Sequence, residues 1–171
     1  MTVPTTSPES TQLAGMLFMQ RSLVAAAAER PADVSGPLDE AGQLAQRTGE
    51  GNAYGFGFGP TNVGLWRMAS ALESGDYDRV VSIAEGLHPE AHHSRERQAT
   101  YWLDFGRAAA RLRGRRDKAV VALRRAEQLH PTRVLRNPLA RDTVAELLTR
   151  ARRDAGGREL RGLAYRMGVA G

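Results

Sequence analysis

The stretch Gly75-Asp-Tyr-Asp-Arg-Val80 follows a pattern that occurs three times in this chain. In each copy a glycine is followed by an aspartate at the third position and by alanine or valine at the fifth, and the copies begin at Gly36, Gly75 and Gly114. Successive copies are 39 residues apart. A fixed period of this size in helix-forming sequence is typical of stacked helical hairpins. The repeat therefore predicts a right-handed array of antiparallel helical hairpins.

The repeat extends into the helix that follows each glycine, where the aligned positions are mostly apolar. They are Leu44-Ala45, Ile83-Ala84 and Ala122-Leu123. We expect the glycine to form the turn between paired helices, since it adopts a positive φ without a Cβ clash. We expect the aspartate to lie at the start of the second helix, near unpaired backbone N–H groups. The small residue two positions later lets the helices pack closely.

Capping residues divide the chain into about eight helices. Ser7-Pro8 and Asn137-Pro138 each combine an N-cap residue with proline at the first helical position. The first helix has apolar residues recurring at helical spacing, namely Leu13, Met16, Leu17, Leu23 and Val24. The predicted hairpins cover residues 8–50, 59–89 and 94–131, followed by C-terminal helices over 138–168. No segment has the pattern of a strand, so we predict an all-α protein. Residues 1–7 are expected to be disordered and residues 8–171 to form a single repeat domain.

Composition favours a soluble, cytoplasmic protein that is not bound to a membrane. The chain has 171 residues and no cysteine, which excludes disulfides and thiolate metal sites. The apolar run Leu13–Met19 is far shorter than the roughly 20 residues that a membrane helix needs. Residues 1–93 carry five arginines and 11 acidic residues, whereas residues 94–171 carry 19 basic and 8 acidic residues. A basic C-terminal half can bind phosphate or an acidic partner.

Two resemblances follow from these motifs. The helix–turn–helix pairs resemble the tetratricopeptide repeat family, although the period here is longer than that family's. Phe58-Gly-Pro-Thr-Asn-Val63, followed by an amphipathic helix and Glu73-Ser-Gly-Asp76, resembles the C-terminal helical-repeat region of XRE-type transcriptional regulators of actinobacteria. The tail segments His130-Pro131, Asn137–Arg141 and Arg158–Ala164 resemble the same region.

The resemblance implies a regulatory domain that senses a ligand or partner and mediates assembly. In those regulators a separate helix-turn-helix domain binds DNA. Gln43–Gly49 resembles the first helix of such a motif, but Gly51–Gly59 follows it and cannot supply the groove-reading helix. Direct sequence-specific DNA binding is therefore not expected. We expect a truncated, split or companion form of such a regulator.

Six residues around the second hairpin are candidates for ligand or partner binding. Tyr54, Phe56 and Phe58 belong to a glycine-rich loop, whose aromatic side chains either pack into the core or form the lip of a groove. Asn62, Trp66 and Arg67 lie on the first helix of that hairpin, where helical-repeat proteins usually bind. Asn62 also fits a helix-capping role, and Trp66 lies on the apolar stripe of its helix.

Arginines are concentrated on the third hairpin. They are Arg111, Arg113, Arg115, Arg116, Arg124 and Arg125. Such a cluster is either a solvated helix face or a surface for an anion or an acidic partner.

Signatures of catalysis and of cofactor binding are missing from the sequence. It contains no His-Glu-x-x-His, Gly-x-Ser-x-Gly or Walker motif, and His88, His92 and His93 lack the further ligands of a zinc site. We therefore predict a non-catalytic domain without metal or cofactor that binds a peptide, protein or small ligand in bacterial transcriptional regulation. Two alternatives stay open: a self-association module, and non-specific nucleic-acid binding through the basic half.

Overall fold

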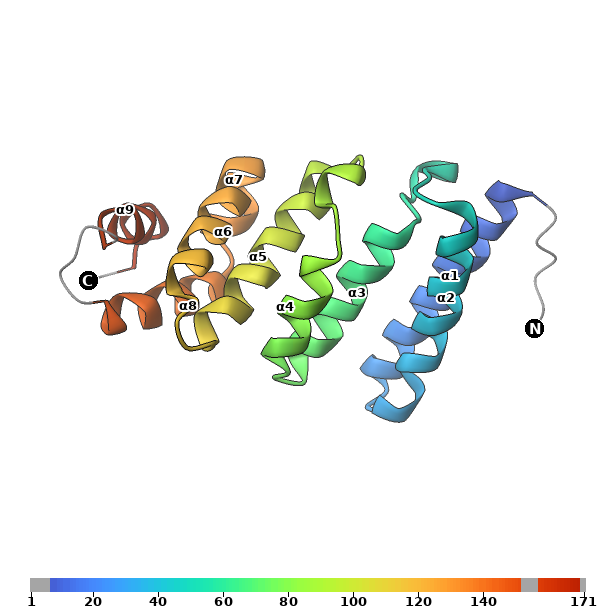
Figure 1. The fold of residues 1–171 in the computed structure, drawn as a ribbon, viewed down its shortest axis with the longest axis horizontal. Helices are drawn as coiled ribbons and strands as arrows, with labels where there is room; N and C mark the ends of the chain where they lie inside the picture. The colour runs from blue at the N-terminus through green and yellow to red at the C-terminus, as the bar shows by residue number, and fades with distance from the viewer. Residues whose placement is uncertain (1–6, 152–156, 170–171) are drawn as a thin grey trace. The chain divides into compact units, whose positions relative to one another are not determined.

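The computed structural model describes residues 7–151 and 157–169, and these residues form α-helices and no strand. The all-α prediction is therefore confirmed. The helices are α1 Pro8–Ala27, α2 Ser35–Thr48, α3 Pro60–Glu73, α4 Tyr77–Glu85, α5 Arg95–Arg111, α6 Arg116–Leu129, α7 Pro131–Leu135, α8 Pro138–Arg150 and α9 Gly157–Met167 (Figure 1). Three short 3₁₀ turns lie between them: η1 Pro31–Asp33, η2 Ala53–Gly55 and η3 Pro89–Ala91.

The chain divides into two compact units. Unit 1 comprises Met1–Arg67 and Gly86–Ser94, and unit 2 comprises Met68–Glu85 and Arg95–Gly171. That residues 8–171 form one right-handed array stays a prediction. The disordered segment expected at residues 1–7 lies outside the described residues except for Ser7.

The predicted N-caps are present in the structure. The Ser7 side chain accepts a hydrogen bond from the Ser10 N–H, and the Asn137 side chain accepts one from the Ala140 N–H. Both prolines stand at the first helical position. Within the described residues there is one more helix than the predicted eight. The additional helix is α7. Its N-cap is His130, whose side chain accepts a hydrogen bond from the Arg133 N–H. The sequence had predicted only the end of the preceding helix at this residue.

The repeat glycines divide into two kinds. Gly75 and Gly114 adopt positive φ values of 75° and 74° in the turns before α4 and α6, as predicted. Gly36 lies inside the first turn of α2 instead, and its φ is not positive. In the first hairpin the residues between Ala27 and Ser35 form a longer connection than those before α4 and α6. The chain turns there at Glu29, which has a φ of 54°, and at η1.

The small residue of each repeat copy is fully buried. Ala41, Val80 and Ala119 each have 0 % of their surface exposed. All three positions therefore lie in the packed interior. The aspartates differ: Asp78 and Asp117 lie in the first turns of α4 and α6, whereas Asp39 lies further along α2 and pairs with Arg67.

Unit 1 is built around the antiparallel pair α1 and α2, which lie side by side (Figure 1). Its core residues come from α1, α2, the following loop and the start of α3. They are Ala14, Met19, Leu38, Ala41, Leu44, Ala45, Phe58 and Val63. The segment Gly86–Ser94 joins this unit through the Thr61 hydroxyl, which donates to the His88 carbonyl oxygen.

Unit 2 is built around α5 and α6, which pack against each other. Helix α4 packs on α5. Helices α8 and α9 pack against each other, with α8 on α5 and α9 on α6. The Tyr101 hydroxyl on α5 donates a 2.9 Å hydrogen bond to the Ala84 carbonyl oxygen on α4. The core of α5–α9 is aliphatic and includes Leu103, Leu123, Val134, Val144 and Leu163.

Candidate functional site

The glycine-rich loop after α2 is held by hydrogen bonds at several points. The Gly51 N–H donates to the Phe58 carbonyl oxygen at 2.8 Å, and the Gly57 N–H donates to the Asn52 side chain at 3.0 Å. The Ala53 N–H donates to Oε1 of Gln12, a buried α1 side chain, at 2.9 Å. These contacts give the loop one defined path along α1.

That path separates the three candidate aromatic residues. Phe58 is 1 % exposed and belongs to the core of unit 1, whereas Tyr54 and Phe56 are 69 % and 51 % exposed. Tyr54 has a positive φ of 56°, in the left-handed region that residues other than glycine rarely adopt. The structure therefore does not bring the three side chains together as one lip: Phe58 has the core role and the other two face solvent.

Asn62 positions the loop from the first turn of α3. It is fully buried, and its Nδ2 donates a 2.8 Å hydrogen bond to the Gly57 carbonyl oxygen. The same oxygen lies 3.2 Å from Nε2 of His92. Since Nδ1 of His92 accepts from the Ser94 N–H, Nε2 is the protonated nitrogen that donates to Gly57.

Trp66 and Arg67 lie further along α3, at the end of its unit 1 part, and both contact other residues of that unit. Trp66 is partly buried against the core, and Arg67 donates to the Asp39 carboxylate at 2.9 Å and to the Leu38 carbonyl oxygen at 3.2 Å. Oδ1 of Asn62 and Nε1 of Trp66 are buried without a hydrogen-bond partner among the described residues.

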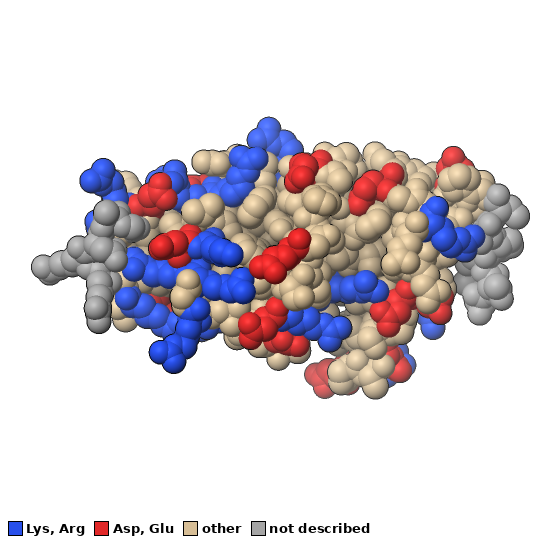
Figure 2. Space-filling model, viewed as in Figure 1, with Lys and Arg blue, Asp and Glu red and all other residues tan. Residues whose placement is uncertain are grey.

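The basic surface of unit 2 consists largely of ion pairs. Figure 2 shows lysine and arginine side chains over this unit with acidic side chains between them. Arg111 lies 2.6 Å from Glu146, Arg115 lies 3.4 Å from Glu85, and Arg124 pairs with Glu159. Arg116 is half-buried. Within the described residues no ion pair is found for the exposed Arg113 and Arg125.

Asp104 on α5 is a buried acid that the sequence did not single out. It is 7 % exposed, and an Arg107 guanidinium nitrogen lies 3.3 Å from its Oδ1. Burial raises the pKa of the Asp104 carboxyl to about 6, although Arg107 and Arg133 act to lower it. The one signal in the sequence was an aspartate between the apolar residues Leu103 and Phe105.

The exposed face of α1 is the main apolar surface that the sequence did not assign to a site. Leu13, Leu17, Leu23 and Val24 are between 37 % and 60 % exposed. The residues that α1 buries lie on its other side and include Ala14, Met19 and Ala25. The helical spacing of the large aliphatic residues therefore marks an outer face, because the buried side of α1 carries mainly small or polar residues, apart from Met19.

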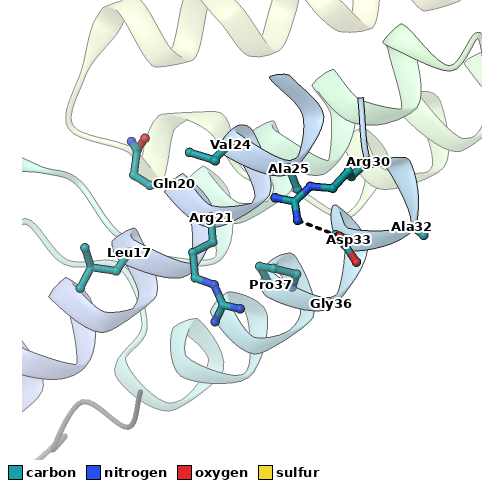
Figure 3. Close-up of a pocket in the computed structure, with 10 residues that line it drawn as sticks. All are labelled: Leu17, Gln20, Arg21, Val24, Ala25, Arg30, Ala32, Asp33, Gly36 and Pro37. Atoms are coloured by element: carbon teal, nitrogen blue, oxygen red, sulfur yellow. Dashed lines mark ion pairs between the residues drawn. The ribbon is translucent and has the colours of Figure 1, made fainter. Parts of the chain in front are cut away.

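An open pocket of 720 Å³ lies beside this face, between α1, η1 and the start of α2 (Figure 3). Its apolar lining includes Leu17, Val24, Ala25 and Pro37. The polar lining is Gln20, Arg21 and the pair Arg30–Asp33, whose closest charged atoms are 3.4 Å apart. The Ser22 hydroxyl donates to the Val34 carbonyl oxygen at 2.9 Å, and this hydrogen bond holds the segment between α1 and α2 against α1.

A second, smaller pocket of 300 Å³ lies at the glycine-rich loop and is lined by Glu50, Asn52, Gly57, His92 and His93, among others. Oε1 of Glu50 accepts the Thr61 N–H at 2.7 Å, so this carboxylate is used to cap α3. In the part of the chain that the structure describes, no three His, Asp or Glu side chains converge as metal ligands.

Comparison with protein-family models, with curated proteins and with solved structures finds no significant match to this chain. Among the described helices, none has the length and apolar character required to cross a membrane.

Proposed function

We propose that this chain is a non-catalytic helical-repeat module that binds a protein partner through the outer face of α1 and the adjoining pocket. The observation that carries the proposal is the group of large aliphatic side chains exposed on α1 next to an open apolar pocket. Contiguous apolar surface of this kind is typical of interaction sites. Burial of each half-exposed aliphatic side chain would contribute on the order of 1 kcal/mol to binding.

The resemblance to XRE-type regulators gives this binding a biological role. A partner bound at α1 would be sensed or assembled in bacterial transcriptional control, and this chain would not itself read DNA. Phe58, Asn62 and Arg67 then act indirectly, because they fix the loop and α3 against the α1–α2 pair.

Peptide ligands selected from a random library on the full chain test the proposal. Leu17→Gln should weaken their binding about tenfold or more, which corresponds to about 1.4 kcal/mol. Leu139→Gln is the matched control, since Leu139 is an equally accessible leucine on α8 of unit 2. Ligands that bind both variants as well as the wild type would overturn the proposal, as would the selection of no ligand.

Self-association is a second candidate, supported by the charges of the two units. Unit 1 contains 4 basic and 7 acidic residues, a net of −3, and unit 2 contains 20 basic and 12 acidic residues, a net of +8. Opposite charges of this size would favour a contact between unit 1 of one copy and unit 2 of another. Such an assembly dissociates as salt is added. Light scattering that shows a monomer at both low and high salt would exclude it.

A further inference from the structure

The spacing of the exposed residues on α1 indicates what kind of segment fits this face, and this inference rests on the proposed function. Leu13, Leu17, Gln20 and Val24 are separated by intervals of four, three and four residues. Their side chains therefore form one continuous row along the helix. Alternating intervals of three and four are the pattern by which one helix packs along another.

An extended segment would not match this row. The side chains of a strand that point to one side recur every two residues, at about 6.6 Å. The four residues on α1 instead follow the helical repeat and span about 16 Å from Leu13 to Val24. A partner helix of three to four turns covers that length.

The charges beside the row differ between its two flanks. On the pocket side stands Arg21, whose guanidinium lies 5.7 Å from the centre of the Phe18 ring. No ion pair is found for Arg21 among the described residues, whereas the other arginine of the pocket, Arg30, is paired with Asp33. The opposite flank carries Met16 and Leu23, which are uncharged. An acidic residue on one flank of the incoming helix would meet Arg21.

We propose that the outer face of α1 binds one amphipathic α-helix of a partner protein. Aliphatic side chains of that helix pack along Leu13, Leu17 and Val24, and one of them occupies the pocket. A carboxylate on its pocket-side flank pairs with Arg21.

Three synthetic peptides of equal length, each about six turns of helix at the usual 3.6 residues per turn, test this proposal against the full chain. The first has leucines at alternating intervals of three and four with glutamate on one flank. The second has the same leucines at intervals of two. The third is the first with lysine in place of glutamate. We expect only the first to bind the wild type, with Leu17→Gln weakening it about tenfold and Leu139→Gln leaving it unchanged.

Exchange of the charges tests the role of Arg21. Arg21→Glu should weaken binding of the first peptide and strengthen binding of the third, each by about tenfold at low salt. Equal binding of the first two peptides would overturn the helical partner, and an unaltered preference in Arg21→Glu would overturn the carboxylate. A wild-type dimer that Leu17→Gln converts to a monomer would show that the occupant is a second copy and not another protein.

The outcomes separate this inference from the proposed function. If library-selected ligands depend on Leu17 but bind as extended chains, the binding face stands and the helical partner fails. If no ligand depends on Leu17, both fail.

Discussion

The ring of Phe58 lies against Gly15 of α1, in the space that a Cβ atom on residue 15 would occupy. This contact places the end of the glycine-rich loop over the middle of α1. It also explains why α1 has glycine inside a long helix, where this residue weakens the helix by roughly 0.5–1 kcal/mol relative to alanine. The contact between Gly15 and Phe58 thus joins the loop to the α1–α2 pair.

Phe58→Ala should destabilise the protein by about 3–5 kcal/mol, because it leaves a cavity in the core of unit 1. The free energy of unfolding in urea measures this effect. Phe56→Ala is the matched control two residues earlier, where the ring is half-exposed, and it should change stability by no more than about 0.5 kcal/mol. Equal losses in the two variants would contradict the different placement of the rings.

Gly15→Ala should be destabilising only while Phe58 is present. Although alanine favours helix, its Cβ would overlap the Phe58 ring. In a Phe58→Ala background the same substitution should be neutral or stabilising by up to about 1 kcal/mol. A double-mutant cycle checks this coupling. Additive effects of the two substitutions would show that the two residues do not touch.

The three repeat glycines should not be equally sensitive to substitution by alanine. Gly75→Ala and Gly114→Ala should each destabilise by about 1–2 kcal/mol, since both positions have positive φ. Gly36→Ala should change stability by less than about 0.5 kcal/mol, because Gly36 is helical and the helix propensity that alanine gains is offset by crowding of its Cβ against Pro37. Thermal unfolding of the three variants compares them, and a loss in Gly36→Ala as large as in the other two would contradict its assignment to the helix.

Asp104→Asn should change the pH dependence of stability. The folded pKa of about 6 lies above the ordinary 3.8, so the folded state binds this proton more tightly. Its contribution to stability is complete below about pH 4 and is lost as the pH rises through about 6. Between pH 7 and pH 4 the free energy of unfolding of the wild type should therefore rise by on the order of 2 kcal/mol relative to that of Asp104→Asn. Urea unfolding across this range measures the difference, and parallel profiles would contradict the raised pKa.

Local signals in the sequence predicted the helices well. Ser7 and Asn137 cap the helices predicted to follow them, and Gly75 and Gly114 turn the chain where the repeat placed them. The repeat was less informative for Gly36, because a shared motif does not fix φ when the preceding connection has a different length. The short helix α7 was missed because its signal, His130-Pro131, also reads as a helix end.

The candidate site was predicted less completely. The sequence singled out the glycine-rich loop and the start of α3, but it did not separate Phe58 from Tyr54 and Phe56, which share the same local context. It identified the apolar residues of α1 but not which of them face solvent. It also identified the arginines of the third hairpin, but it did not predict that acidic residues of α8 and α9 pair with Arg111 and Arg124.

By itself, then, the sequence of this protein determined the all-α class, the helix starts marked by Ser7 and Asn137, and the buried repeat positions Ala41, Val80 and Ala119. These depend on hydrogen bonds and periodicity within a few turns of one helix. The tertiary structure alone decided that Phe58 packs inward on Gly15 and that Leu17 and Val24 face outward beside a pocket. Burial is a property of segments distant in the sequence, since a side chain leaves water only where another part of the chain covers it.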